Sequence, residues 1–195
     1  MSNLKVIQLL PELNIGGVER GTKDFSKALV EKGHQSIVIS NGGIFEDDIV
    51  SDGGQHIKIP IHKKNLFSFL LSKKLKAIYE NEKPDIVHVR SRMPAWINYY
   101  AFKKMENKPL LVSTFHGIYS NPIYSQIMAK VDHIIAISET VKNYIIDTYK
   151  TPESSITTIP RGCDIDMFNK ETASYDWINK WYKQFPQTRN KIILT

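Results

Sequence analysis

The chain has 195 residues, of which 42% are hydrophobic and 24% charged, a balance typical of a folded globular protein and unlike that of a disordered chain. Its 26 Lys and Arg residues outnumber 20 Asp and Glu residues, and the resulting net charge of +6 favours anionic partners. A single cysteine excludes an intramolecular disulfide, and no run of about 20 apolar residues predicts a membrane span, so we expect a cytoplasmic protein.

Short apolar segments alternate with longer amphipathic segments along the chain. Strands are predicted at residues 5–10, 36–40, 55–60, 85–89, 110–114, 133–136 and 156–159. Helices are predicted at residues 18–31, 66–81, 95–106, 121–130 and 139–149. This alternation is typical of βαβ units. It predicts an α/β fold, a Rossmann-like, doubly wound and mostly parallel sheet with helices on both faces and a ligand site at the carboxyl ends of its strands.

The alternation changes near the C-terminus. Residues 174–185 predict a helix in which Trp177 and Trp181, one turn apart, share a face. Residues 190–195 predict one more strand. We expect residues 1–170 to form an N-terminal domain and residues 171–195 to be a linker helix and the first strand of a second domain. The alternative is that the last strand lies at the edge of the same sheet.

A glycine pair, Gly16-Gly17, separates the first predicted strand from the first predicted helix. Glycines at a helix N-terminus let backbone amides approach a ligand closely, and the helix dipole favours an anion such as phosphate there. The alternative is a tight turn without a ligand. A dinucleotide fingerprint is absent, because the spacing differs and no carboxylate follows the second strand. This absence argues against an NAD-type oxidoreductase.

His116 ends the fifth predicted strand, and Arg90 and Arg92 follow the fourth. A histidine at this edge of a parallel sheet can hydrogen-bond a substrate or move a proton, and arginines there can bind phosphate or carboxylate. The alternatives are a surface histidine and solvated charge. The other histidines lack the spacing of metal ligands, so we predict no metal site. No aromatic-basic platform or helix-turn-helix pattern predicts a nucleic-acid partner.

Five segments in the same order resemble family 4 glycosyltransferases, which have the GT-B architecture. They are the glycine-rich loop at residues 11–20, Asp85-Ile86-Val87-His88, Thr114-Phe115-His116-Gly117, residues 131–139 and residues 159–168. Two positions depart from the family pattern. Arg161 stands where Asn is usual, and Cys163 stands where the family has a small aliphatic residue.

The resemblance implies a retaining transfer of a sugar from a nucleotide-sugar donor to a glycan or lipid-linked acceptor, as in cell-envelope polysaccharide biosynthesis. The donor is a co-substrate, and no separate cofactor or metal is implied. His116 would lie beside the transferred sugar, and Gly16 and Gly17 would face the donor phosphate. The further substrate-binding candidates are Glu19, Arg90, Arg92, Ser138, Glu139 and Arg161.

The resemblance also implies that the residues holding the nucleotide belong to a donor domain that would follow Thr195. On its own, the chain should therefore bind acceptor weakly and catalyse little. The alternative is a non-catalytic binding module, or one subunit of a split enzyme with the same fold.

Residues 62–76 combine lysines with a segment dense in Leu and Phe. A basic, apolar helix of this kind can lie in the interface of an anionic bilayer, so the protein can be peripheral on the cytoplasmic face of the membrane. The membrane-contact candidates are Lys63, Lys64, Phe67, Leu70, Lys73 and Lys74. The alternative is an ordinary amphipathic helix whose Leu71, Leu75 and Ile78 pack on the sheet.

Overall fold

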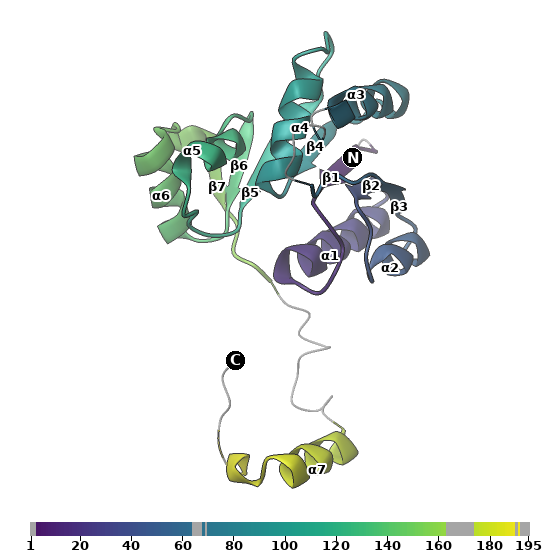
Figure 1. Ribbon diagram of the computed structural model, residues 1–195, viewed down its shortest axis with the longest axis vertical. Helices are drawn as coiled ribbons and strands as arrows, with labels where there is room; N and C mark the ends of the chain where they lie inside the picture. The colour runs from purple at the N-terminus through teal and green to yellow at the C-terminus, as the bar shows by residue number, and fades with distance from the viewer. Residues whose placement is uncertain (1–2, 64–67, 69, 163–173, 190, 192–195) are drawn as a thin grey trace. The chain divides into compact units, whose positions relative to one another are not determined.

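A computed structural model describes residues 3–63, 68, 70–162, 174–189 and 191 of the chain. The chain divides into two compact units, Met1–Pro160 and Arg161–Thr195, and each is described by itself (Figure 1). The first unit contains a seven-stranded sheet in which every neighbouring pair of strands is parallel.

The sheet confirms the predicted Rossmann-like α/β fold. In spatial order, β3-β2-β1-β4-β5-β6-β7, each strand ends within two residues of its predicted bounds. The strands are β1 (Lys5–Leu9), β2 (Gln35–Ser40), β3 (Gln55–Lys58), β4 (Ile86–Val89), β5 (Leu110–Phe115), β6 (His133–Ala136) and β7 (Ile156–Thr158). The strand order reverses between β1 and β4, which places a topological switch point, where parallel sheets bind ligands, beyond Leu9 and Val89.

The helices of the first unit differ from the predicted ones mainly at their ends. They are α1 (Gly17–Glu31), α2 (Glu46–Ser51), α3 (Leu71–Glu82), α4 (Arg92–Phe102), α5 (Pro122–Ser125), followed by the 3-10 turn η2 (Gln126–Ala129), and α6 (Glu139–Tyr149). A further 3-10 turn, η3 (Glu153–Ser155), precedes β7.

Three helices differ from the prediction, and the first two differences have physical reasons. The sequence did not predict α2, because its six residues are too few to show a helical period. α4 begins three residues before its predicted start, since Pro94 lies in the first turn, where its missing amide costs no hydrogen bond. The predicted helix at 121–130 is instead a four-residue helix that continues as a 3-10 turn.

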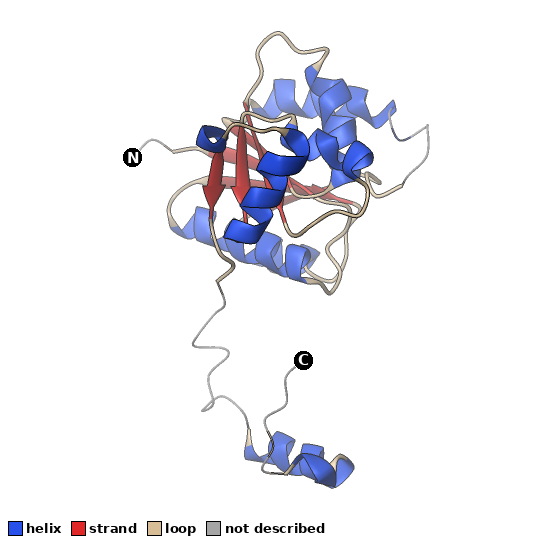
Figure 2. Cartoon of the chain, turned by 90° about the vertical axis from the view of Figure 1, so that its left-hand side faces the viewer, coloured by secondary structure: helices blue, strands red, loops and turns tan. Residues whose placement is uncertain are grey.

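The two faces of the sheet carry different helices, and Figure 2 shows helices on both sides of the strands. Ile7 and Leu9 of β1 point into the larger core, together with buried residues of α3, α4 and α6. Gln8, between them, points to the other face and donates its amide to the carbonyl of Thr22 in α1 at 3.2 Å. A smaller core on that face joins Leu10, Leu13, Val38 and Ile49 of α2.

The second unit contains α7 (Tyr175–Gln184) and the 3-10 turn η5 (Pro186–Thr188). Trp177 and Trp181 stack with ring centroids 5.5 Å apart, which confirms the predicted shared face. The indole of Trp181 also donates to Thr188 Oγ1 at 3.0 Å and so joins the helix to the turn. The predicted strand at 190–195 lies outside the described residues, apart from Lys191.

Candidate functional site

The loop between β1 and α1 presents a helix N-terminus at the switch point. Gly16 is the N-cap of α1, has an extended backbone and makes no side-chain cap, and Gly17 is exposed. The carboxylate of Glu19 folds back over Gly16. A Cβ added to Gly16 would lie only 3.0 Å from Glu19 Cδ. A negative charge at this end of the helix is favoured by its dipole. The first turn of α1 therefore already attracts an anionic group.

The loop after β2 holds the β1–α1 loop in place through backbone contacts. Leu13 donates its amide to the carbonyl of Gly42 at 2.9 Å, and Phe45 donates to the carbonyl of Leu13 at 3.1 Å. Gly43 has φ of +149°, and a Cβ added there would lie 2.6 Å from the Leu13 carbonyl oxygen. Only glycine fits this close approach. The sequence did not predict this role of Gly43, because the contact joins two loops that are far apart along the chain.

Arg90 is buried at the end of β4, with 9% of its surface exposed, so the alternative of a solvated loop charge is wrong for this residue. Its Nη1 donates to Gln8 Oε1 at 2.9 Å. A Cβ added to Gly21 of α1 would lie 3.4 Å from its Nη2, so the guanidinium lies against the first turns of that helix. Arg90 thus places a positive charge between β1, β4 and α1.

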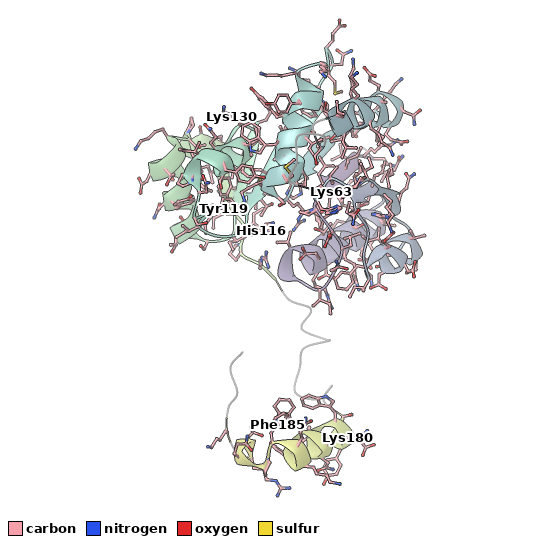
Figure 3. All side chains as sticks on the ribbon, viewed as in Figure 1. Lys63, His116, Tyr119, Lys130, Lys180 and Phe185 are labelled. Atoms are coloured by element: carbon pink, nitrogen blue, oxygen red, sulfur yellow. The ribbon has the colours of Figure 1, made fainter. Side chains whose placement is uncertain are left out.

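His88 lies beside Arg90 and His116 and is neutral. Its Nε2 and the hydroxyl of Thr114 are 2.7 Å apart, and both side chains are buried. Burial holds the pKa of His88 well below its ordinary value, and electrostatic interactions with Arg90 and His116 lower this pKa further. His116 follows β5 and is half-buried (Figure 3). The candidate catalytic histidine, His116, and Arg90 therefore both lie near the buried His88.

We expect stability to fall on acidification because of His88. Unfolding returns its pKa to about 6.5, so the unfolded chain gains a proton that the folded chain excludes as pH drops below this value. Urea unfolding at pH 8 and 5.5 measures this loss, which His88→Gln should reduce. The matched variant is His133→Gln, whose imidazole meets the Thr157 hydroxyl in an exposed position. An unchanged pH dependence in His88→Gln would contradict the assignment.

Arg92, the first residue of α4, lies against the loop that follows His116. Its Cζ is 4.9 Å from the centre of the Tyr119 ring and 5.4 Å from that of Tyr124. Its Nη1 donates to Ser125 Oγ at 3.4 Å. Arg92 could be proposed from its place after β4, but the two tyrosines could not, because Tyr119 lies in a loop and Tyr124 in a helix of four residues, neither of which shows a periodic pattern.

Of the other substrate-binding candidates, Ser138 and Glu139 make contacts within α6 and its cap, and Arg161 lies in the second unit. The Ser138 hydroxyl accepts from Val141 N at 3.3 Å, so Ser138 is the N-cap of α6, as its sequence position predicts. The Glu139 carboxylate lies 3.9 Å from Lys142 Nζ. Arg161 is exposed and belongs to the second unit. Their part in substrate binding stays a prediction.

Four of the membrane-contact candidates are described by the structure, and two are not. Lys63, Leu70, Lys73 and Lys74 are exposed, Leu70 by 64%. Leu75 is buried, and Leu71 and Ile78 pack against the larger core, as the amphipathic-helix alternative predicts for them. Lys64 and Phe67 lie outside the described residues.

A cavity of about 640 Å³ opens at the other end of the sheet, where β5 and β6 begin. Its lining includes Tyr99, Lys103, Lys108, Lys130 and Asp132.

Within the described part of the chain, no cluster of three His, Cys, Asp or Glu side chains forms a metal site. No helix among those residues is long and apolar enough to cross a bilayer.

The fold and site define a Rossmann-like domain whose switch point combines a glycine-led helix N-terminus, a buried arginine and a histidine. Residues 15–167 match the model of glycosyltransferase family 4. The chain belongs to this family.

Solved structures with GT-B glycosyltransferase folds resemble the chain. A glycosyltransferase from Rickettsia africae is 33% identical, with a TM-score of 0.79, over 97% of this chain and 51% of that one. Anabaena HepE, solved with UDP and glucose, is 17% identical, with a TM-score of 0.70, over 93% of this chain and 50% of that one. WaaG, a glycosyltransferase involved in lipopolysaccharide biosynthesis, is 11% identical, with a TM-score of 0.66, over 95% of this chain and 52% of that one. The chain thus spans about half the length of these proteins, and no protein with a curated function gave a significant match.

Proposed function

We propose that these residues form the acceptor-side domain of a glycosyltransferase that transfers a sugar from a nucleotide sugar to a glycan or lipid-linked acceptor with retention of configuration. A second, donor-binding domain would complete the enzyme. The observation that carries the proposal is that the Gly16-Gly17 turn, Arg90 and His116 follow β1, β4 and β5, three neighbouring strands, at the carboxyl ends of a sheet that belongs to glycosyltransferase family 4.

Each part of the site has a role in this proposal. The amides at the start of α1 would face the donor phosphate, with Glu19 moving aside or binding a sugar hydroxyl. Arg90 adds a buried positive charge behind them. His116 would hold a hydroxyl of the transferred sugar or stabilise its developing charge. The nucleotide sugar would be a co-substrate, with no separate cofactor or metal ion.

The experiment uses the two-domain protein and a panel of nucleotide sugars with glycan and lipid-linked acceptors. We expect one donor to be consumed with transfer to an acceptor, and NMR of the product to show the anomeric configuration of the donor. The 195-residue chain alone should transfer little sugar under the same conditions. Failure of every donor to yield a glycosylated product would refute the proposal.

Gly17 tests the helix N-terminus. We expect Gly17→Val to weaken donor binding in the two-domain protein, because its side chain would stand where phosphate approaches the amides. α1 should still form, since a first-turn residue does not interrupt its hydrogen bonds. Calorimetric titration with the donor measures the effect, and circular dichroism checks the fold. Gly33→Ala, beyond the other end of α1, where an added Cβ has nothing within 4 Å, is the control. Unaltered donor affinity would reduce the glycine pair to a turn.

We further propose that the protein binds the membrane peripherally, at the cytoplasmic face, through the basic surface around α3. The support is the exposure of Lys63, Leu70, Lys73 and Lys74. Each lysine near an anionic surface contributes about 1 kcal/mol, and salt screens this contribution. Sedimentation should show binding to anionic vesicles at low salt and less at high salt. Equal, negligible binding to anionic and neutral vesicles at low salt would contradict this proposal and favour a soluble acceptor.

A further inference from the structure

Arg92 is a cation without an acidic partner among the described residues. It is half-buried and lies between two aromatic rings, 4.9 Å from the Tyr119 centroid and 5.4 Å from the Tyr124 centroid. None of the ion pairs among the described residues involves Arg92. Its hydrogen bond to Ser125 Oγ, at 3.4 Å, is long. The charge is therefore held in place without being neutralised.

The two rings that hold Arg92 are themselves fixed. The Tyr119 ring packs on the Phe115 ring with centroids 5.2 Å apart. The backbone carbonyl of Tyr119 accepts a hydrogen bond from the Tyr144 hydroxyl at 3.1 Å. The carbonyl of Tyr124 accepts from the indole of Trp96 at 3.0 Å. Because the rings are positioned by the surrounding structure, a ligand of Arg92 would not have to order them.

Both phenols are neutral and supply no counter-charge. Burial raises the pKa of Tyr119 and the pKa of Tyr124, and the charge of Arg92 offsets only part of each rise. Neutral rings bind a guanidinium through their faces. Its N–H edges remain suited to a planar or tetrahedral oxyanion, which they can bind through paired hydrogen bonds.

Arg92 and the rings of Tyr119 and Tyr124 form a clamp, which adjoins the candidate catalytic histidine, His116. Tyr119 lies three residues after His116, and the His116 backbone hydrogen-bonds the Tyr119 phenol and lowers its pKa. Figure 3 shows both side chains near the end of the unit at which β7 leads out of the sheet. A group bound to Arg92 would therefore lie close to the place where the sugar is transferred.

We propose that Arg92, clamped between Tyr119 and Tyr124, binds an oxyanion of the acceptor and makes the enzyme select anionic acceptors over neutral ones. This inference rests on the proposed transferase function. A sugar carboxylate and the phosphate of a lipid-linked sugar present the same kind of oxyanion to the guanidinium. The acceptor class is thus a glycan or lipid carrying such a group near the accepting hydroxyl.

The first test measures binding to the 195-residue chain by NMR, so it does not depend on transfer. The probes are methyl glucuronide, geranyl phosphate and the neutral methyl glucoside. We expect the two anions to shift the Arg92 side-chain signal and the backbone amide signals of residues 119 and 124, which the variants retain. The anion that binds more tightly indicates the source of the oxyanion, and the glucoside should bind far more weakly. Arg92→Gln should weaken anion binding about 10-fold or more, since a hydrogen bond to a charged group is lost.

Three variants separate the clamp from general basicity. Lys130→Gln removes the same charge from the cavity at the other end of the sheet and should leave binding unchanged. Tyr124→Leu removes a ring and should weaken binding, whereas Tyr124→Phe keeps the ring and should preserve it. Equal affinity for glucoside and glucuronide, or equal losses in Arg92→Gln and Lys130→Gln, would overturn the proposal.

A second measurement links the clamp to catalysis in the two-domain protein. We expect Arg92→Gln to lower kcat/KM for an anionic acceptor about 10-fold or more and to change that for its neutral analogue little. Equal losses for both acceptors would overturn acceptor selection by Arg92. A protein that transfers no sugar to any acceptor would instead refute the proposed function, while the binding test would still report on the clamp.

Discussion

Replacing His116 with alanine in the two-domain enzyme should lower turnover about 10²-fold or more, with little change in folding stability. His116 lies at the carboxyl end of β5 and interacts electrostatically with the buried His88. Its loss would remove a hydrogen-bonding group at the reacting sugar, an interaction that is strongest in the transition state. Steady-state kinetics under saturating donor and acceptor measure turnover, and urea unfolding measures stability.

The control for His116 is His133→Ala. His133 begins β6, at the opposite end of the strands, and its Nε2 meets the Thr157 hydroxyl at 2.8 Å. We expect this variant to keep its turnover. Equal turnover in His116→Ala and the unmodified enzyme would exclude His116 from the mechanism, whereas equal losses in both variants would point to a general effect on the sheet.

Replacing Gly43 with valine should destabilise the first unit by about 2–5 kcal/mol, which combines the costs of a strained backbone and of overpacking. A side chain there would meet the backbone of Leu13, which lacks the freedom of a side-chain end to move away. Because Leu13 belongs to the loop that leads into α1, the displacement should reach the glycine pair and weaken donor binding as well. Urea unfolding and donor titration of the two-domain protein measure the two effects.

Gly43→Ala and Gly33→Ala separate the contact from the backbone conformation. Both glycines have positive φ, +149° and +80°, but an added Cβ at Gly33 has nothing within 4 Å. Gly33→Ala should therefore show only the conformational cost, about 1 kcal/mol. If Gly43→Ala costs no more than Gly33→Ala, the approach to Leu13 does not constrain this loop.

The sheet could be predicted from the sequence because its strands are short, apolar and separated by amphipathic helices. β6, for example, matches its predicted bounds, and Ser138 caps α6 as expected. α2 escaped prediction because a helix of six residues has fewer than two turns in which to repeat an apolar pattern.

The candidate site could be predicted where a residue follows a strand directly, as His116 and Arg90 do. Its supporting residues could not. The contact of Gly43 with Leu13 joins two loops, and the stacking of Tyr119 on Arg92 joins residues from different βα units. Such contacts depend on how the loops fold over the strand ends, which strand and helix periodicity does not specify.

The position of β1 has a consequence for synthesis of the chain. β1 is central, yet its two neighbours are made at different times, since β2 follows it closely and β4 begins only at Ile86. Until then, Lys5–Leu9 has one open edge, and an unpaired strand edge is a template for association with other chains. A ribosome-bound fragment ending before β4 should therefore depend more on chaperones than one that includes it.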